Sequence, residues 1–282
     1  MHILTFDIED WFRISPKFSG INNNKSLYYL SEFEKNLDII CRFLSENQFK
    51  ATFFWLGKEA KRFPDLVRKI YDAGHEIGVH SYDHNRLNHT EKNKFITNTE
   101  RAVKILEDIT GNPITTYRAP GLSINKDTLW AFEILYDLGI KTDSSLPARS
   151  FTGSHYIPDN PFIINYYGVE IKEFPVSSFS ILKHPFNFSS SGYFRITPYW
   201  FLHKEIQKHF YTMSYFHPRD FDKNIHKLIK GNIYFKLKYR IGTKNAYHKL
   251  EKLSETITWI SIENAMNQLN GKNLNILHFK EF

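Results

Sequence analysis

Two histidines that lie four residues apart could hold a metal ion. His80 and His84 end the run from Gly74, which reads Gly-His-Glu-Ile-Gly-Val-His-Ser-Tyr-Asp-His. Neutral imidazole is a preferred ligand of zinc and its neighbours among the first-row transition metals, and one turn of chain can direct both rings at one ion. The alternative is a pair of ordinary loop residues, in a chain that has 13 histidines. A metal site therefore needs further ligands from elsewhere.

Three acidic residues near the N-terminus could supply a ligand or a catalytic base. Asp7, Glu9 and Asp10 follow the apolar run Ile3 to Phe6. Carboxylates this close repel one another, so a fold that gathers them needs a cation there or uses one of them as a base. The alternative is a helix N-terminus or a turn, because both also attract acidic residues.

The elements that must position these side chains alternate between strands and helices. Apolar runs predict strands at Ile3 to Phe6, Ala51 to Leu56, Ile77 to Val79, Ile140 to Thr142, Val169 to Phe174 and Tyr211 to Phe216, with a short segment at Thr115 to Arg118. Helical spacing predicts helices at Ser26 to Asn47, Asp65 to Ala73, Thr90 to Ile109, Asn125 to Leu138 and Pro198 to Phe210, and a helix, strand and helix between Thr243 and Asn270. Repeated strand-helix units predict a parallel sheet, closed as a barrel or open.

The length and composition predict one globular α/β domain. The chain has 282 residues, 41% of them hydrophobic, and shows no internal repeat or clear linker. We expect a single domain over residues 1–282, with a loop insertion around 147–168, where Pro158, Pro161 and Gly153 mark an excursion, and a C-terminal extension after about residue 220. This domain is large enough for one sizeable core.

Charge and cysteine content limit the partners and the compartment. The net charge is +7, but the densest basic stretch, Lys227 to Arg240, is interleaved with apolar residues and fits a half-buried segment, so we expect no nucleic-acid binding. Cys41 is the only cysteine, and no run of about 18 apolar residues or signal-peptide pattern is present. The sequence therefore predicts a cytoplasmic protein with no transmembrane segment.

Five candidate side chains fall at the ends of predicted strands: Asp7, His80, Arg118, Asp143 and His217. In α/β folds, functional groups collect at the C-terminal ends of parallel strands. Each of the five could be structural on its own. Their common position favours one active site.

Five short runs, taken in order, resemble the motif series of the polysaccharide deacetylases, which are also called carbohydrate esterase family 4 or the NodB-homology group. These runs are Thr5 to Trp11, Gly74 to His84, Tyr117 to Pro120, Asp143 to Ser145 and Tyr215 to Asp220. Three further runs resemble the branch of this family that is associated with exopolysaccharide biosynthesis: Ala51 to Gly57, Glu173 to Pro175 and Gly192 to Arg195. The resemblance implies a distorted (β/α) barrel with about seven parallel strands.

The resemblance implies one divalent metal ion, most often zinc. His80 and His84 match two of its ligands. The usual first motif places two aspartates side by side, base then ligand, but position 8 here is Ile8. In some related deacetylases the ligand lies two residues after the base, which indicates Glu9, with Asp10 as the second candidate. Residues i and i+2 of an extended chain share a face, so Asp7 and Glu9 can share a site.

The resemblance also implies the catalytic groups. Asp7 matches the general base, His217 the general acid, and Arg118 the group that holds the base. Asp143 matches the residue that orients the acid, and a backbone N–H near Gly121 would stabilise the oxyanion.

The resemblance implies a metal-dependent hydrolase that removes the N-acetyl group from an amino sugar in a polysaccharide or its precursor and releases acetate. The substrate would be an N-acetylated glycan or sugar precursor, and Trp11, Tyr82 and Tyr193 are candidate sugar contacts near the motifs. Two alternatives remain from the sequence. One is an amidase acting on a small cyclic or linear amide. The other, suggested by the altered first motif, is a glycan-binding protein without turnover.

Overall fold

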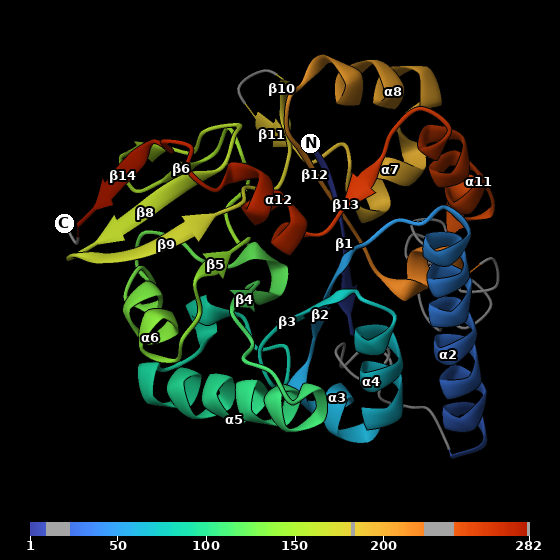
Figure 1. Ribbon diagram of the computed structural model, residues 1–282, viewed down its shortest axis with the longest axis horizontal. Helices are drawn as coiled ribbons and strands as arrows, with labels where there is room; N and C mark the ends of the chain where they lie inside the picture. Colours follow the sequence, from blue (N-terminus) through green and yellow to red (C-terminus); the bar gives the residue numbers. More distant parts are fainter. Residues whose placement is uncertain (10–22, 182–183, 223–239, 281–282) are drawn as a thin grey trace.

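The computed structural model describes residues 1–9, 23–181, 184–222 and 240–280 (Figure 1). Asp10 and Trp11, two of the residues expected near the site, lie outside these ranges. So does the basic stretch Lys227 to Arg240, except for its last residue. Within the described ranges, no helix is both long and apolar enough to cross a membrane.

Seven parallel strands form the centre of the fold. In spatial order they are β12 (Thr212–Phe216), β1 (His2–Ile8), β2 (Thr52–Trp55), β3 (Glu76–Val79), β4 (Thr116–Tyr117), β5 (Thr142–Asp143) and β9 (Val169–Glu173). Each strand ends within a residue or two of a predicted boundary. Strands β1, β2 and β12 are buried on both faces along most of their length, because helices cover one side and strand side chains fill the other, whereas β9 alternates between buried and partly exposed residues.

Side-chain hydrogen bonds join the two ends of this sheet. The backbone N–H of Met213 in β12 donates to Ser177 Oγ, 2.8 Å away, just beyond β9. The Tyr211 hydroxyl donates to the Pro175 carbonyl, also at 2.8 Å. Strand-to-strand pairing is thus replaced by side-chain contacts at this seam. The fold is the expected distorted (β/α) barrel with an incomplete closure.

Strands β8 (Phe162–Tyr166) and β14 (Ile276–Phe279) extend the sheet, because β8 pairs antiparallel with β9 and parallel with β14. The short β13 (Trp259–Ile260) pairs with the start of β1. Two small hairpins complete the β structure: β6 (Phe151–Thr152) with β7 (His155–Tyr156), and β10 (Phe179–Ile181) with β11 (His184–Phe186). The loop expected around 147–168 is therefore only partly a loop.

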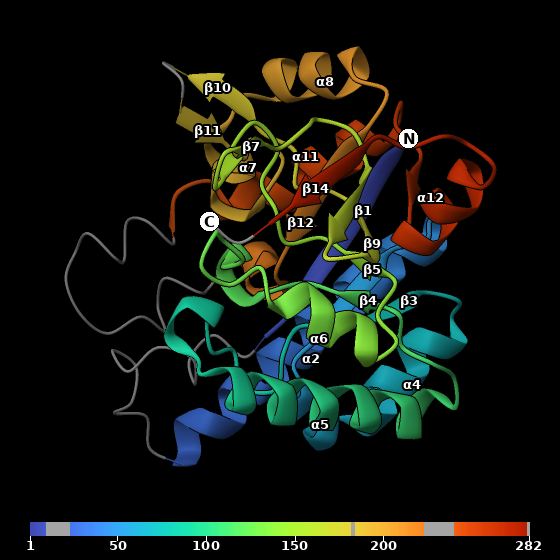
Figure 2. The same ribbon diagram turned by 90° about the vertical axis from the view of Figure 1, so that its left-hand side faces the viewer.

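The helices lie mainly on the outer face of the sheet (Figures 1 and 2). They are α2 (Asn23–Glu46), α3 (Gly57–Arg62), α4 (Pro64–Asp72), α5 (Lys92–Thr110), α6 (Ala131–Asp137), α7 (Ser191–Ile196), α8 (Tyr199–Lys208), α11 (Thr243–Ser254) and α12 (Ile262–Leu269). Short 3₁₀ turns are η2 (Leu87–His89), η3 (Pro120–Leu122) and η4 (Pro218–Phe221). Most of their buried apolar residues form one core with the strands, and those of α12 form a second cluster with Ile3, Phe54 and Met213.

Two helices start later than predicted, because polar side chains bind local backbone groups. Asn125 Oδ1 accepts the N–H of Asp127 at 2.8 Å, which makes a turn where a helix was expected, and α6 begins only at Ala131. Thr90 does not cap α5. Its hydroxyl donates to the Arg86 carbonyl at 2.8 Å, and the helix begins at Lys92.

Candidate active site

The predicted site residues meet at one edge of the barrel. Asp7 lies in β1 and Glu9 directly follows it, His80 follows β3, Arg118 follows β4, and His217 follows β12. All these strands are parallel, so their C-terminal ends share an edge. This confirms that the strand ends converge.

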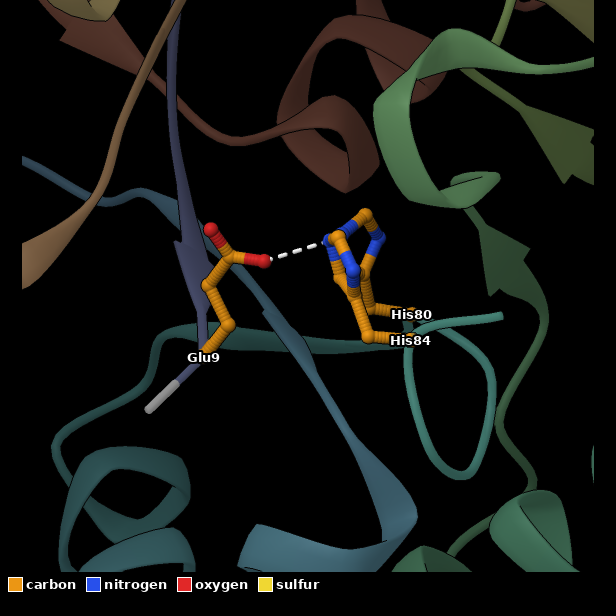
Figure 3. A group of neighbouring side chains, drawn as sticks. All are labelled: Glu9, His80 and His84. Atoms are coloured by element: carbon orange, nitrogen blue, oxygen red, sulfur yellow. Dashed lines mark ion pairs between the residues drawn. The ribbon is translucent and has the colours of Figure 1, made fainter. Parts of the chain in front are cut away.

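Glu9, His80 and His84 form a group that could hold a metal ion (Figure 3). One potential ligand atom from each residue lies within 4.8 Å of the other two. Glu9 Oε2 is 2.6 Å from His84 Nε2. Two imidazoles and one carboxylate are a usual donor set for zinc at sites that keep a position open for substrate. Among the described residues, this group supports Glu9 as the carboxylate ligand.

The local backbone directs the two histidines. Ser81 and His84 have φ values of 67° and 63°, in the left-handed region, so the chain turns sharply between the rings. The His84 N–H donates to Ser81 Oγ at 3.1 Å and holds this turn. His80 Nδ1 lies 2.8 Å from the Arg118 carbonyl, so it carries the proton and leaves Nε2 as the ligand atom.

The charge states of this group suit a cation. Burial lowers the pKa of His80 to about 4, so its imidazole is neutral near pH 7. Burial alone would raise the pKa of Glu9, but the charges of Arg219, His84 and His217 outweigh it and hold that pKa well below its usual value. Glu9 is therefore a carboxylate although only 4% of its surface is exposed. The residues present fit a divalent ion.

Arg118 holds Asp7 in a fully buried ion pair. Its Nη1 donates to Asp7 Oδ1 at 2.9 Å and to Thr5 Oγ1 at 2.7 Å. Its Nε and Nη2 donate to the carbonyl and the hydroxyl of Ser144, at 2.9 and 2.8 Å. The guanidinium also lies over the Phe54 ring, 4.2 Å from its centroid. Arg118 has the position expected of a residue that holds the base.

His217 is oriented by Asp220, and the expected partner Asp143 is elsewhere. His217 Nδ1 lies 3.0 Å from Asp220 Oδ2 and 3.2 Å from Ser191 Oγ in α7. Its backbone N–H donates to the same Asp220 oxygen at 2.9 Å. The other ring nitrogen, Nε2, lies 3.1 Å from Glu9 Oε1 and so faces the metal group.

The charge on Asp220 is stabilised by its neighbours. Burial alone would raise its pKa, but the hydrogen bond and charge of His217, followed by the charges of Arg195 and Arg219, lower that pKa far below its ordinary value. A carboxylate on Nδ1 fixes the tautomer in which that nitrogen carries the proton. Asp220 therefore orients His217, the role that the sequence led us to expect of Asp143.

Asp143 instead belongs to a buried polar layer beneath Arg118. It accepts the Ser145 hydroxyl at 2.7 Å and the Ser145 N–H at 3.1 Å. Burial raises the pKa of Asp143, and burial together with the charge of Asp143 raises that of the neighbouring Glu173. Ser145 and Ser144 connect this layer to the motif around Arg118. Asp143 therefore supports the arginine from a distance.

The expected sugar contacts fall in different places. Tyr193 lies in α7 and is 45% exposed, and its ring centroid is 4.2 Å from that of Phe186. It comes two residues after Ser191, whose hydroxyl contacts His217. Tyr82 packs away from the metal group, because its ring lies against Gly57 and under the Arg101 guanidinium, 4.1 Å from the centroid. Tyr193 is thus the better placed of the two.

Gly121 lies in η3, three residues after Arg118. Its φ is 60°, and a Cβ there would come within 2.8 Å of Arg86 Nε. The turn after the arginine motif therefore requires glycine.

Three residues of the site were not predicted: Ser191, Arg219 and Asp220. Asp220 and Arg219 follow His217 in the run His-Pro-Arg-Asp, and the pairing of His217 with Asp220 is the reciprocal cap of the short η4 turn. An acidic residue three positions after a candidate N-cap was a visible signal. Ser191 comes from a distant segment, and spacing gave no signal for it.

Residues 4–141 match the polysaccharide deacetylase family. This part of the chain belongs to that family. Residues 143–267 match a domain of unknown function (DUF3473). The deacetylase match contains the candidate base, Arg118 and all three metal-group residues, whereas His217, Asp220 and Arg219 lie in the second match. The two matched segments together build one site.

Curated relatives of this polysaccharide deacetylase segment include two peptidoglycan deacetylases. The peptidoglycan-N-acetylglucosamine deacetylase of Bacillus cereus is 33% identical over 91 residues, which are 32% of this chain and 33% of the relative. The peptidoglycan deacetylase of Helicobacter pylori is 31% identical over 120 residues, 42% of this chain and 40% of the relative. The chain thus spans well under half the length of the curated relatives it matches.

A solved structure from Mycobacterium smegmatis, assigned to the polysaccharide deacetylases, shares the fold. It aligns with a TM-score of 0.66 over 99% of this chain and 93% of its own, at 18% identity. Identity this low supports the fold alone. The likeness therefore extends over both matched segments in architecture.

Proposed function

We propose that this protein is a metal-dependent N-deacetylase that removes acetyl groups from an N-acetylated amino sugar of a glycan or its precursor. One observation carries the proposal: a metal-binding group of Glu9, His80 and His84 stands in contact with His217 and next to the Asp7–Arg118 pair. Membership of residues 4–141 in the deacetylase family supports it. A binding protein would have little use for an oriented acid and base together.

A divalent ion, which the donor set indicates to be zinc, would act as a Lewis acid toward water and the acetyl carbonyl. His80 Nε2, His84 Nε2 and Glu9 Oε2 would hold it. Asp7 would accept the proton of the attacking water, and Arg118 would keep its carboxylate in place through Oδ1. The buried setting strengthens each of these electrostatic interactions.

His217 would donate a proton to the departing sugar amine from Nε2, the nitrogen that faces the metal group. An amine leaves poorly until it is protonated, so this donor completes the reaction. Asp220 on Nδ1 stabilises the charged imidazolium before transfer. The products would be acetate and a free amino sugar.

The substrate class is an N-acetylated glycan or sugar precursor, and the exposed Tyr193 ring of α7 offers a surface for stacking a pyranose. Association with exopolysaccharide biosynthesis, zinc as the physiological metal and a cytoplasmic location stay predictions. Fractionation of native cells would test the location, and metal analysis of protein purified from them would test the ion.

The test combines metal analysis with acetate release from N-acetylated oligosaccharides. We expect about one metal ion per chain and acetate release, with Asp7→Asn and His217→Ala keeping the metal and losing turnover by at least about 100-fold. Lys69→Gln, which breaks only an exposed contact with Asp38, serves as the matched control.

Three outcomes would contradict the proposal. Acetate release that persists in both Asp7→Asn and His217→Ala would show that these residues are not the base and the acid. Hydrolysis of a small cyclic amide without acetate release would replace the deacetylase with an amidase. Metal and glycan binding without any turnover would leave a binding protein.

A further inference from the structure

We propose that Arg219 is a positioning residue that holds Glu9 as a metal ligand through one oxygen only. The inference rests on the metal site of the proposed function and adds a role that the motif residues do not provide. It assigns Arg219 to the coordination geometry of the ion, and so to the number of positions left for water and substrate.

The two oxygens of Glu9 have separate partners. Oε2 is directed at the histidines, 2.6 Å from His84 Nε2, while Oε1 is turned away from them (Figure 3). Oε1 is instead contacted by Arg219 Nη1 and by His217 Nε2, the latter at 3.1 Å. Only one carboxylate oxygen therefore faces the position of an ion.

Arg219 takes its place from the same turn that sets the acid. It is the second residue of η4, which begins directly after His217 and is held by the reciprocal His217–Asp220 cap. Its side chain is 16% exposed and reaches Glu9, which is 4% exposed. The turn therefore delivers the acid and the arginine together to one carboxylate.

A second carboxylate oxygen on the ion would occupy a position that the reaction needs. Carboxylates bind metals through one or both oxygens, and a hydrolytic site must keep positions for water and for the carbonyl. His217 cannot hold Oε1 throughout the reaction, because its Nε2 must turn to the leaving group. Arg219 can, since a guanidinium does not lose its proton.

Electrostatics argue against a role for Arg219 in strengthening metal binding. A permanent cation beside the ligand carboxylate repels a divalent ion and competes for the same negative charge. The chain nevertheless directs this cation at Glu9. Control of the carboxylate geometry accounts for that placement, whereas affinity does not.

The experiment uses the full chain loaded with cobalt(II), whose visible absorption reports the number of ligands. We compare wild type, Arg219→Gln and Arg219→Lys, with Arg68→Gln as the matched control because Arg68 donates to the Thr110 carbonyl on the helical surface, away from the site. Acetohydroxamate binding to each cobalt protein measures the open positions directly. Thermal unfolding of each variant checks that it is folded.

We expect Arg219→Gln to bind one cobalt ion at least as tightly as wild type, because a repelling charge is gone. Its visible absorption should weaken as the ligand number rises, and its affinity for acetohydroxamate should fall by about tenfold. Arg219→Lys keeps the charge without the planar fork and should fall between the two. Arg68→Gln should match wild type.

Unchanged absorption and hydroxamate affinity in Arg219→Gln would overturn the proposal and leave the deacetylase site intact. Loss of cobalt from a folded Arg219→Gln would also overturn it, because the arginine would then be required for binding itself. If Arg219→Gln does not fold, Arg219→Lys decides by the same two measurements. Wild type that binds no cobalt would remove the metal site, and both proposals with it.

Discussion

Breaking the buried Asp7–Arg118 pair by removing either partner should lower the free energy of unfolding, and removing both should cost less than the two single losses together. The Arg118 side chain is 0% exposed and that of Asp7 is 5% exposed. Replacing Arg118 with methionine, of similar length, leaves a buried carboxylate without its cation. Removing one partner of such a pair costs about 3–5 kcal/mol. In a chain of this size that corresponds to a fall in Tm of about 6–20 °C.

A double-mutant cycle in urea, on metal-free protein, measures the pair itself. Asp7→Asn alone leaves Arg118 without a counter-charge, and we expect a similar loss. The double variant Asp7→Asn/Arg118→Met should lose less than the sum of the single losses, by at least about 1 kcal/mol, because no uncompensated charge remains. Chelator is needed because a bound ion would itself compensate Asp7. Losses that add to within about 0.5 kcal/mol would refute the argument that the pair is electrostatically coupled.

Three further predictions follow from the site and its surroundings. Zinc at 100 times its Kd should stabilise wild type by about 2.7 kcal/mol in urea unfolding and leave His84→Gln unchanged. Asp220→Asn should lower kcat by at least about tenfold and change the pH dependence of kcat, whereas Asp143→Asn should leave that dependence unchanged; the reverse result would support the sequence-based assignment of Asp143. Burial and the Lys50 charge lower the pKa of His75 to about 4, so the unfolded chain binds a proton that the folded one does not, and stability falls as pH drops from about 6.5 to 4. His75→Asn should reduce the slope of unfolding free energy against pH by up to the equivalent of about one proton. An unchanged slope would mean that other groups cause the pH dependence.

The barrel strands and the metal group could be predicted because their signals are local. Strands β1, β3 and β12 are short, largely apolar runs that end at polar side chains, and parallel pairing brings those side chains to one edge. Glu9 was predicted as a ligand from the resemblance to related deacetylases, and the shared face of residues i and i+2 in an extended chain was consistent with it. Both carboxylates are buried in the structure, Asp7 against Arg118 and Glu9 against His84 and His217.

The errors have a common physical origin in contacts between distant segments. Asp143 was expected beside His217, but its carboxyl group is bound by Ser145 and Glu173, which no local pattern reveals. Strand β8 was missed because prolines and aromatics surround it, although Phe162, Ile164 and Tyr166 alternate as a half-buried strand should. Tyr82 was assigned to sugar binding from its neighbours in sequence, whereas Arg101 of α5 decides its environment.

The first strand of the chain has consequences for the order of folding. On one edge β1 pairs with β2, 47 residues later, and its first residues His2 and Ile3 pair there with Trp259 and Ile260. On the other edge His2 and Ile3 pair with Thr212 and Met213 of β12. Contacts across so many residues form slowly, since a long loop must close before they are made. During synthesis one edge of β1 therefore stays unpaired until residues 212–216 of β12 have been made. The boundary between the two family matches, at residues 141–143, falls inside the sheet and cannot serve as a point where half the molecule folds first.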